Sequence, residues 1–360
     1  YWRDGSLEKY TPSGNYVVTK FARWAFEKFP QAKDILGTQM RAVGEAMSIG
    51  RTFKESFQKA IRSMEIGRHG LGGAKDFGEL SLDELRKHLA QPSSERVFIM
   101  YEALRKGMSG EELYQLTHIG PWFIEQMREL VDFEETLKGY TWDTLLNGLL
   151  VRAKEDGFSD LYLAKLFRVG EKTVRERRIA LGKVARFKAV PVSGVENAAY
   201  YYSSYNEQED DVKISENRKV MILGGGPNRI GQGIEFDYTC VHAAFTLRDE
   251  GYESIMVNCN PETVSTDYDT SDKLYFEPLT VEDVLAIYEK EQPEGVIVQF
   301  GGQTPLNIAQ ELKDNGVKIL GTTPESIRLA EDREYFRERI IALGIPQPES
   351  GAARSLEEAL

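Results

Sequence analysis

Hydrophobic runs alternate with amphipathic stretches over residues 219 to 345, and this pattern predicts strands that are each followed by a helix. The apolar runs predict strands at 219–223, 254–257, 295–299 and 317–320. The stretches with helical spacing predict helices at about 233–250, 280–291, 304–314, 324–330 and 333–343. Strands that alternate with helices build parallel sheets with right-handed crossovers, so an α/β fold is expected here.

Polar, glycine-rich loops follow three of these strands, at 224–233, 258–269 and 301–305. Ligands of parallel sheets bind at the carboxyl ends of the strands, and glycines let backbone N–H groups approach an anion. A dinucleotide site is not favoured, because Arg229 stands where the third glycine of that fingerprint belongs. The second strand also ends at Asn258 rather than at an acidic residue. Since no nucleophile–base pair, metal-ligand spacing or P-loop lysine is evident, the sequence predicts the edge of a site without its own chemistry.

Residues 67 to about 190 show short helices and no other pattern. Capping boxes recur at Ser81/Glu84 and Ser109/Glu112. A helix at 122–137 is expected to bury Phe123, Met127, Leu130, Val131 and Leu137. The helix that follows the first glycine loop is expected to bury Ile234, Tyr238, Val241, Ala244 and Phe245. The first of these regions is predicted to be a small all-helical domain.

The N-terminal 66 residues have too little regular structure for a domain of their own. Residues 16–19 read as a strand, and Thr52 with Glu55 forms a capping box. The helix that it opens is expected to bury Phe53, Phe57, Ala60, Ile61 and Met64. The chain lacks an initiating Met and ends in a helical start at 355–360, so a piece of a longer protein is expected.

One segment of the helical region admits a second interpretation. Two short helices around Gly170 have the spacing of a helix-turn-helix, and the region is locally basic, with Arg175, Arg177 and Arg178. We favour a helical hairpin with a solvated or docked charged face, because the chain as a whole is acidic. Residues 191–218 are read as a connection, in which the tyrosines at 200–205 pack rather than stack on nucleic acid.

Composition narrows the function classes. The formal net charge of −12 argues against a general nucleic-acid or acidic-membrane binder. Two cysteines without CxxC spacing predict neither a zinc site nor a disulfide framework, which fits a reducing cytoplasm. No apolar run approaches the length of a membrane span and no signal peptide is evident, so a cytoplasmic protein is expected.

Several motifs carry a resemblance to a known family. Gly-Gly-Gly-Pro-Asn-Arg-Ile-Gly-Gln-Gly-Ile-Glu-Phe-Asp-Tyr at 224–238 and Asn-Cys-Asn-Pro-Glu-Thr at 258–263 resemble the carbamoyl phosphate synthetase large chain. The same holds for Gly-Gly-Gln-Thr-Pro-Leu at 301–306, Ala-Glu-Asp-Arg at 330–333 and the stretch at 38–52. The resemblance covers the whole chain in the family's order, and motifs of this length are specific.

The resemblance implies a division of the chain. Residues 1–66 would be the tail of the first, carboxyphosphate-forming ATP-grasp half, and 67–214 the all-helical oligomerisation domain with its linker. Residues 215–345 would be the Rossmann-like pre-ATP-grasp domain of the second, carbamoyl-phosphate-forming half, and 346–360 the start of its ATP-grasp domain. The implied fold class is therefore all-α followed by α/β.

The family makes carbamoyl phosphate from bicarbonate, ammonia and two ATP, for arginine and pyrimidine biosynthesis. The resemblance implies a small glutaminase subunit and a homo-oligomer as partners. It also implies that ATP and Mg²⁺ (or Mn²⁺) bind outside this chain, so that no catalytic, cofactor-binding or metal-binding residue lies within it. By itself, the chain is expected to make no carbamoyl phosphate.

Unstable carbamate travels between the two halves of these enzymes in a shielded tunnel. Residues that match its lining in the family are Met40, Glu45, Arg229, Gly233, Glu235 and Glu262. Glu235 and Glu262 have a second interpretation, as carboxylates that cap a helix end or a loop. Tunnel lining is favoured over it for Arg229 and Glu235, and neither interpretation is favoured for the others. Two other function classes stay open: a nucleotide-binding α/β module with a helix-turn-helix regulator, and a non-catalytic oligomerisation scaffold.

Overall fold

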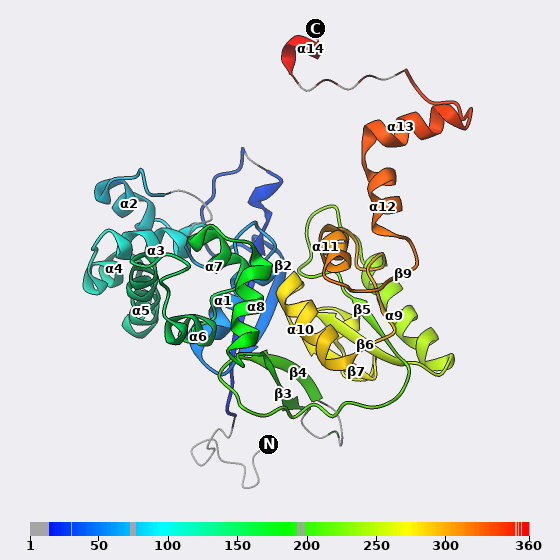
Figure 1. Ribbon diagram of the computed structural model, residues 1–360. Coiled ribbons are helices and arrows are strands. Elements are labelled where there is room, and N and C mark those ends of the chain that lie inside the picture. Colours follow the sequence, from blue (N-terminus) through cyan, green and yellow to red (C-terminus); the bar gives the residue numbers. More distant parts are fainter. Residues whose placement is uncertain are drawn as a thin grey trace.

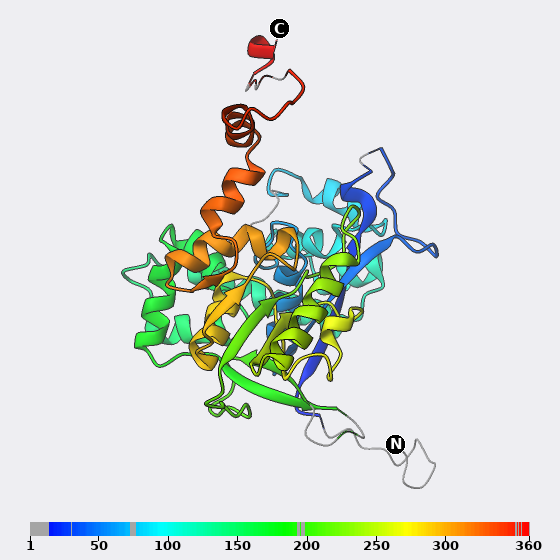
Figure 2. The same ribbon diagram turned by 90° about the vertical axis from the view of Figure 1, so that its right-hand side faces the viewer.

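The computed structural model describes residues 14–29, 31–72, 77–192, 195, 199–349, 351, 353 and 355–359. A helical part and a sheet part lie side by side in it, and α13 (Arg333–Ala342) and α14 (Leu356–Ala359) extend away from both (Figures 1 and 2). Both classes of structure that the sequence predicted are present. Within the described part of the chain, none of the helices is long and apolar enough to cross a membrane.

The N-terminal segment is an antiparallel strand pair followed by a helix. Its elements are β1 (Val17–Trp24), the 3-10 turn η2 (Ala25–Glu27), β2 (Ala42–Gly50) and α1 (Phe53–Ser63). The Thr52 hydroxyl accepts the N–H of Glu55, as predicted. The Glu55 carboxylate, however, accepts the N–H of Arg51 and of Tyr205, so only half of the predicted capping box forms. Glu55 thus ties the start of α1 to the distant chain.

The helical part contains α2 to α8, packed around one apolar core. Their bounds are α2 (Leu82–Leu89), α3 (Arg96–Arg105), α4 (Gly110–Thr117), α5 (Pro121–Lys138), α6 (Asn147–Glu155), α7 (Asp160–Phe167) and α8 (Glu171–Ala180). The predicted capping box of Ser81 and Glu84 forms. Ser109 caps α4, but Glu112 does not complete the predicted second box and instead accepts a hydrogen bond from Arg86. The prediction that α5 buries Phe123 is wrong: Phe123 is 46% exposed, and its neighbour Ile124 faces the core instead.

The sheet has seven strands among the described residues, in the order β3-β4-β7-β6-β5-β8-β9. Their bounds are β3 (Arg186–Pro191), β4 (Ala199–Ser204), β5 (Lys219–Leu223), β6 (Glu253–Asn258), β7 (Lys273–Phe276), β8 (Gly295–Ile297) and β9 (Ile319–Leu320). All pairs are parallel except β3 with β4. Reading 67–190 as helical throughout and 191–218 as a mere connection was therefore wrong, because β3 and β4 extend the sheet. β7 was also missed.

Helices cover both faces of this sheet, as in other doubly wound folds. α10 (Val281–Glu291) and α11 (Gln303–Asp314) pack on one face, and α9 (Glu235–Asp249) packs on the other. α12 (Pro324–Glu331) continues beyond the last strand. The expected apolar stripe of α9 is only partly buried: Val241 and Ala244 are buried, but Ile234 is 81% exposed, Tyr238 62% and Phe245 40%.

A group of buried ion pairs joins α1 and the helical part to the sheet part. Lys59 Nζ lies 2.6 Å from Glu277 Oε1, and Lys154 Nζ lies 2.7 Å from Glu282 Oε1. We call this group the ion-pair junction; it comprises Lys59, Arg62, Lys154, Asp160, Arg178, Glu277, Glu282 and Asp283. Its side chains are almost completely buried, so α1 is enclosed on its polar side as well as on its apolar side.

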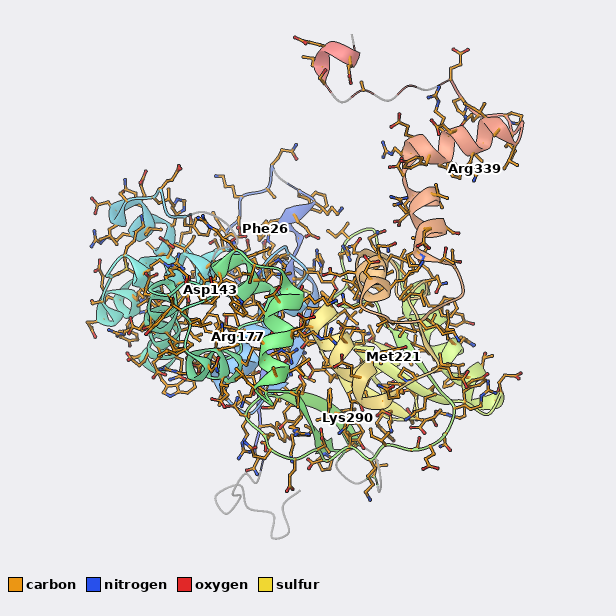
Figure 3. The ribbon with its side chains drawn as sticks, viewed as in Figure 1. Phe26, Asp143, Arg177, Met221, Lys290 and Arg339 are labelled. Carbon is orange, nitrogen blue, oxygen red and sulfur yellow. The ribbon has the colours of Figure 1, made fainter. Side chains whose placement is uncertain are left out.

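The arginines of the suspected helix-turn-helix are engaged within the protein. Arg178 binds Asp160 in the ion-pair junction, and Arg175 pairs with Glu289 of α10. Arg177, labelled on α8 in Figure 3, donates to the carbonyl oxygens of Trp142 and Leu145. Because these side chains hold α8 to its neighbours, they are not free to contact phosphates. The structure thus argues against the nucleic-acid interpretation of this segment.

Candidate functional site

The three glycine-rich loops meet at the carboxyl edge of the sheet. β5 lies between β6 and β8, so the chain turns to opposite sides of β5 there, and such switch points form ligand crevices in α/β folds. A Cβ at Gly301 would collide with the Gly224 carbonyl, and one at Gly224 would collide with Asn258. Asn258 Oδ1 accepts the backbone N–H of Gly226 at 3.0 Å. These glycines are therefore required for the close packing of the loops.

The N-terminal segment closes one side of this edge. Met47 N of β2 donates to the Cys259 carbonyl at 2.9 Å, and a Cβ at Gly44 would collide with the Asn228 backbone. β2 therefore packs directly on the first two loops, although more than 160 residues separate them along the chain. The site is built from two regions that the sequence pattern treats as separate.

Between these elements lies a cleft of about 280 Å³, which we call the loop cleft. It is lined by Val43, Gly225, Gly226, Asn228, Arg229, Ile230, Gln232, Gly233, Ile234, Phe236, Asp237, Asn258, Glu262, Thr263 and Val264. Three of the six predicted tunnel residues, Arg229, Gly233 and Glu262, are among them. The lining mixes backbone, apolar groups and a few charges, which is the usual character of a small-molecule site.

Arg229 is held at this cleft by two partners that the sequence did not indicate. Its Nη2 lies 3.0 Å from Glu65 Oε2 and 2.8 Å from Thr304 Oγ1. Thr304 Oγ1 also lies 2.7 Å from the same Glu65 oxygen. Thr304 belongs to the Gly-Gly-Gln-Thr-Pro loop, so its position could have been anticipated. Glu65 follows the end of α1 and carried no signal in the sequence.

Glu45 and Glu262 are brought together by a lysine that the sequence analysis missed. Lys20 Nζ of β1 lies 2.7 Å from Glu45 Oε1 and 3.1 Å from Glu262 Oε1. Lys20, which bridges the two carboxylates, lowers the pKa of Glu262. Glu262 is thus an ion-pair partner at the rim of the cleft.

The remaining predicted residues lie differently. The Glu235 carboxylate occupies the space next to Gly233 in which a Cβ would stand, so Gly233 makes room for Glu235. Glu235 is the first residue of α9 and lies outside the lining of the cleft. Met40 precedes β2, is 92% exposed and is likewise absent from the lining. The structure therefore gathers Glu45, Arg229, Gly233 and Glu262 around the cleft, Glu235 beside it, and leaves Met40 apart.

The described residues do not fit a metal site. No group of three or more His, Cys, Asp or Glu in the described ranges is placed to hold a metal ion. Burial raises the pKa of the Cys240 thiol to about 12 and that of Cys259 further, so neither is a ready nucleophile. The arrangement can bind and orient a small polar molecule, and we assign no covalent or metal-assisted step to it.

Two family descriptions match this chain. "Carbamoyl phosphate synthase preATP-grasp domain" matches residues 216–329, which include all three loops, and "Carbamoyl-phosphate synthetase large chain, oligomerisation domain" matches residues 45–182. The chain belongs to the carbamoyl phosphate synthase large-chain family. The resemblance seen in the sequence motifs is thereby confirmed.

Individual relatives agree with this assignment. The chain is 57% identical to the carbamoyl phosphate synthase large chain of Archaeoglobus fulgidus over 357 residues, covering 97% of this chain and 33% of that protein. It is 52% identical to the large chain of Pseudomonas aeruginosa over 355 residues, covering 98% of this chain and 33% of the relative. The large chain of Synechocystis sp. is 52% identical over 360 residues. The chain thus spans about a third of the length of the relatives that it matches.

Proposed function

We propose that this chain is the central part of a carbamoyl phosphate synthase large chain, a ligase. The intact protein would make carbamoyl phosphate from bicarbonate, ammonia and two ATP, for arginine and pyrimidine biosynthesis. The observation that carries the proposal is the identity of 57% over 97% of the chain. The loop cleft supports it, because its arginine and polar loops suit a small anion such as carbamate.

The proposal includes the division of the chain inferred from the motifs. Residues 1–66 end the first synthetase half, 67–214 form the oligomerisation domain with its linker, 215–345 open the second half and 346–360 begin its ATP-grasp domain. A homo-oligomer is proposed because the description matching 45–182 names an oligomerisation domain. A small glutaminase subunit is proposed as the source of ammonia. ATP and Mg²⁺ are placed outside these residues, and a cytoplasmic location fits the two free, buried cysteines.

Within this scheme, carbamate passes the loop cleft on its way between the halves. Arg229 would attract the anion, while Glu45, Gly233, Glu235 and Glu262 would border its route. Carbamate decomposes quickly in water, so a protected passage determines how much of it is converted. Met40 belongs to the proposed route only if another part of the intact protein covers it, since its side chain is exposed here.

The test uses the full-length protein with its glutaminase subunit. Labelled bicarbonate should appear in carbamoyl phosphate, and Arg229→Ala should lower that synthesis about ten-fold or more, as for lost anion stabilisation. Bicarbonate-dependent ATP hydrolysis by the first half should change little. A full-length protein that makes no carbamoyl phosphate, with folded subunits and both ATP sites occupied, would overturn the proposal.

A second measurement distinguishes the proposed ligase from the alternative, a non-catalytic oligomerisation scaffold. The isolated 360-residue chain is expected to form no ATP from ADP and carbamoyl phosphate, whichever function is right. The full-length protein should carry out that reverse reaction if the ligase proposal holds. A scaffold would assemble into an oligomer and show neither reaction.

A further inference from the structure

The carboxylate of Glu65 connects three segments that are far apart in the sequence. Glu65 follows α1, Arg229 belongs to the first glycine-rich loop, and Thr304 lies in the first turn of α11. Both partners contact the same oxygen, Oε2, at 3.0 Å and 2.7 Å. Thr304 Oγ1 also lies 3.0 Å from the Gly225 carbonyl. The contacts therefore fix Arg229 against the loop from which it comes.

The backbone is shaped to bring this carboxylate into place. Glu65 has a φ of +55°, which is uncommon for a residue with a side chain. Gly226 has a φ of +65°, and a Cβ at that position would collide with Glu65 Oε1. Glu65 Oε1 is buried and has no hydrogen-bond partner among the described residues. Two residues with left-handed backbone conformations, from different segments, thus meet at one carboxylate.

The contact between Glu65 and Arg229 lies where two cavities and the loop cleft adjoin. Glu65 lines a cavity of about 480 Å³ beside β1 and another of about 270 Å³ between α1, α10 and α11. Its partner Arg229 lines the loop cleft of about 280 Å³. The pair of side chains therefore forms a wall between the cleft and the two cavities.

We propose that Glu65 is a positioning residue, which holds Arg229 at the loop cleft and closes the wall behind it. The proposal rests on the function proposed above, in which an unstable anion passes this cleft. It adds that the N-terminal segment controls the passage through one carboxylate. Glu65 acts through Arg229 and Thr304 and takes no part in bond making.

The charge state of Glu65 gives the proposal a pH signature. Burial raises the pKa of Glu65 to about 7, against the opposing effects of Thr304, Arg229 and Arg23 of β1. Other titratable groups lie near Glu65. Burial raises the pKa of the Cys259 thiol. In the 270 Å³ cavity, burial raises the pKa of Glu171 to about 8 and lowers that of His69 to about 4. Arg62, Arg68, Glu282 and Glu311 also line that cavity. Glu65 is therefore charged above about pH 7 and holds Arg229 most firmly there.

The experiment measures how many ATP molecules the full-length protein hydrolyses for each carbamoyl phosphate released. Glu65→Ala should raise this ratio about five-fold by freeing Arg229, while bicarbonate-dependent hydrolysis by the first half stays within about two-fold. In the unsubstituted protein the ratio should rise as the pH falls from 8 to 6. Glu65→Gln should remove that pH dependence, and the control Glu171→Gln should keep it.

Two comparisons exclude a merely structural effect. Thr304→Val removes one partner with little change of shape and should raise the ratio less than Glu65→Ala does. The double variant Glu65→Ala/Arg229→Ala should be no worse than Arg229→Ala alone, because both changes remove one interaction. If the unsubstituted protein is active and Glu65→Gln changes neither the ratio nor its pH dependence, the inference is wrong and the proposed function stands. An inactive unsubstituted protein would instead overturn the function.

Discussion

The ion-pair junction and the loop cleft use charge in opposite ways. In the junction, Lys59 and Lys154 are buried against Glu277 and Glu282, and their remaining donors bind backbone carbonyls such as Ser203 and Phe158. At the cleft, Lys20 and Glu262 are exposed and are held by one or two contacts each. Buried charges are costly unless fully paired, whereas exposed charges stay available to a ligand. The protein therefore places its fixed charges between its parts and its available charges at the site.

Glu65 shares one feature with the residues of the ion-pair junction and another with those of the loop cleft. Like the junction residues it is buried, but one of its oxygens has no partner among the described residues. Like the cleft residues it contacts a side chain that lines the site. This intermediate character suits a group that changes its protonation rather than one that holds parts together.

The largest effect should come from breaking the junction. Lys59→Met leaves Glu277 buried without its cation and should lower the free energy of unfolding by about 3–5 kcal/mol. Urea unfolding of the 360-residue chain measures this loss. The matched variant Lys59→Met/Glu277→Gln should recover part of it, since no unpaired charge remains. A loss below about 1 kcal/mol would show that water reaches the junction.

A smaller effect should follow the titration of Glu65. Its pKa is raised from 4.5 to about 7, so the folded chain binds this proton more tightly than the unfolded chain does. The contribution is fully present below about pH 4.5 and is lost as the pH rises through 7. With about 1.4 kcal/mol for each pKa unit, the loss is about 3 kcal/mol. Glu65→Gln should remove this part of the pH dependence, so its stability relative to the unsubstituted chain should increase from pH 5 to pH 8.

Arg229→Ala should affect stability less than either change, although it is expected to affect synthesis most. Because the pKa of Glu65 is about 7, its carboxyl is already largely protonated at pH 6, so removal of Arg229 leaves no unpaired buried charge and the free energy of unfolding should fall by only about 1 kcal/mol. Thermal unfolding at pH 6 and pH 8 measures the difference. A loss as large as that of Lys59→Met would place Arg229 with the junction residues rather than at a site.

The smallest effect should come from Lys20→Ala at the rim of the cleft. Both Lys20 and Glu262 are exposed, so no measurable change in unfolding is expected. The pKa of Glu262 should rise, because the cation that stabilises its carboxylate is removed while the Glu45 carboxylate remains nearby. Carbon-13 NMR of the glutamate carboxyls reports that pKa. An unchanged Glu262 pKa would mean that Lys20 turns to solvent.

The sequence predicted the elements that hydrophobic spacing determines. β5 and β6 are continuous apolar runs, and α5 has a clear stripe, so each was placed within a few residues. β7 has four residues between polar turns, and β3 belongs to a stretch whose helices dominated the pattern, so both were missed. α9 was expected to bury Tyr238, but Tyr238 is exposed. Helical spacing shows that one face of a helix is apolar, and it does not show whether another element covers that face.

The loops of the site were predicted from glycines and strand ends, but their partners were not. Arg229 stood out because it interrupts a familiar glycine pattern. Glu65 and Lys20 are ordinary charged residues on other segments, and each matters through a contact across more than 160 residues. Such contacts depend on how the N-terminal segment packs, and no local pattern encodes that.

The pairing of β4 with β7 has a consequence for how this protein can be divided. Tyr200 and Tyr201 of β4 pair with Leu274 and Tyr275 of β7, so the chain before residue 215 supplies two strands to the sheet after it. Cutting the chain at that point would leave β7 with a row of unpaired N–H and C=O groups, a template for association with other chains. Two fragments expressed from a gene that is split there are expected to aggregate unless they are produced together. The parts before and after residue 215 should therefore be expressed and purified as one chain.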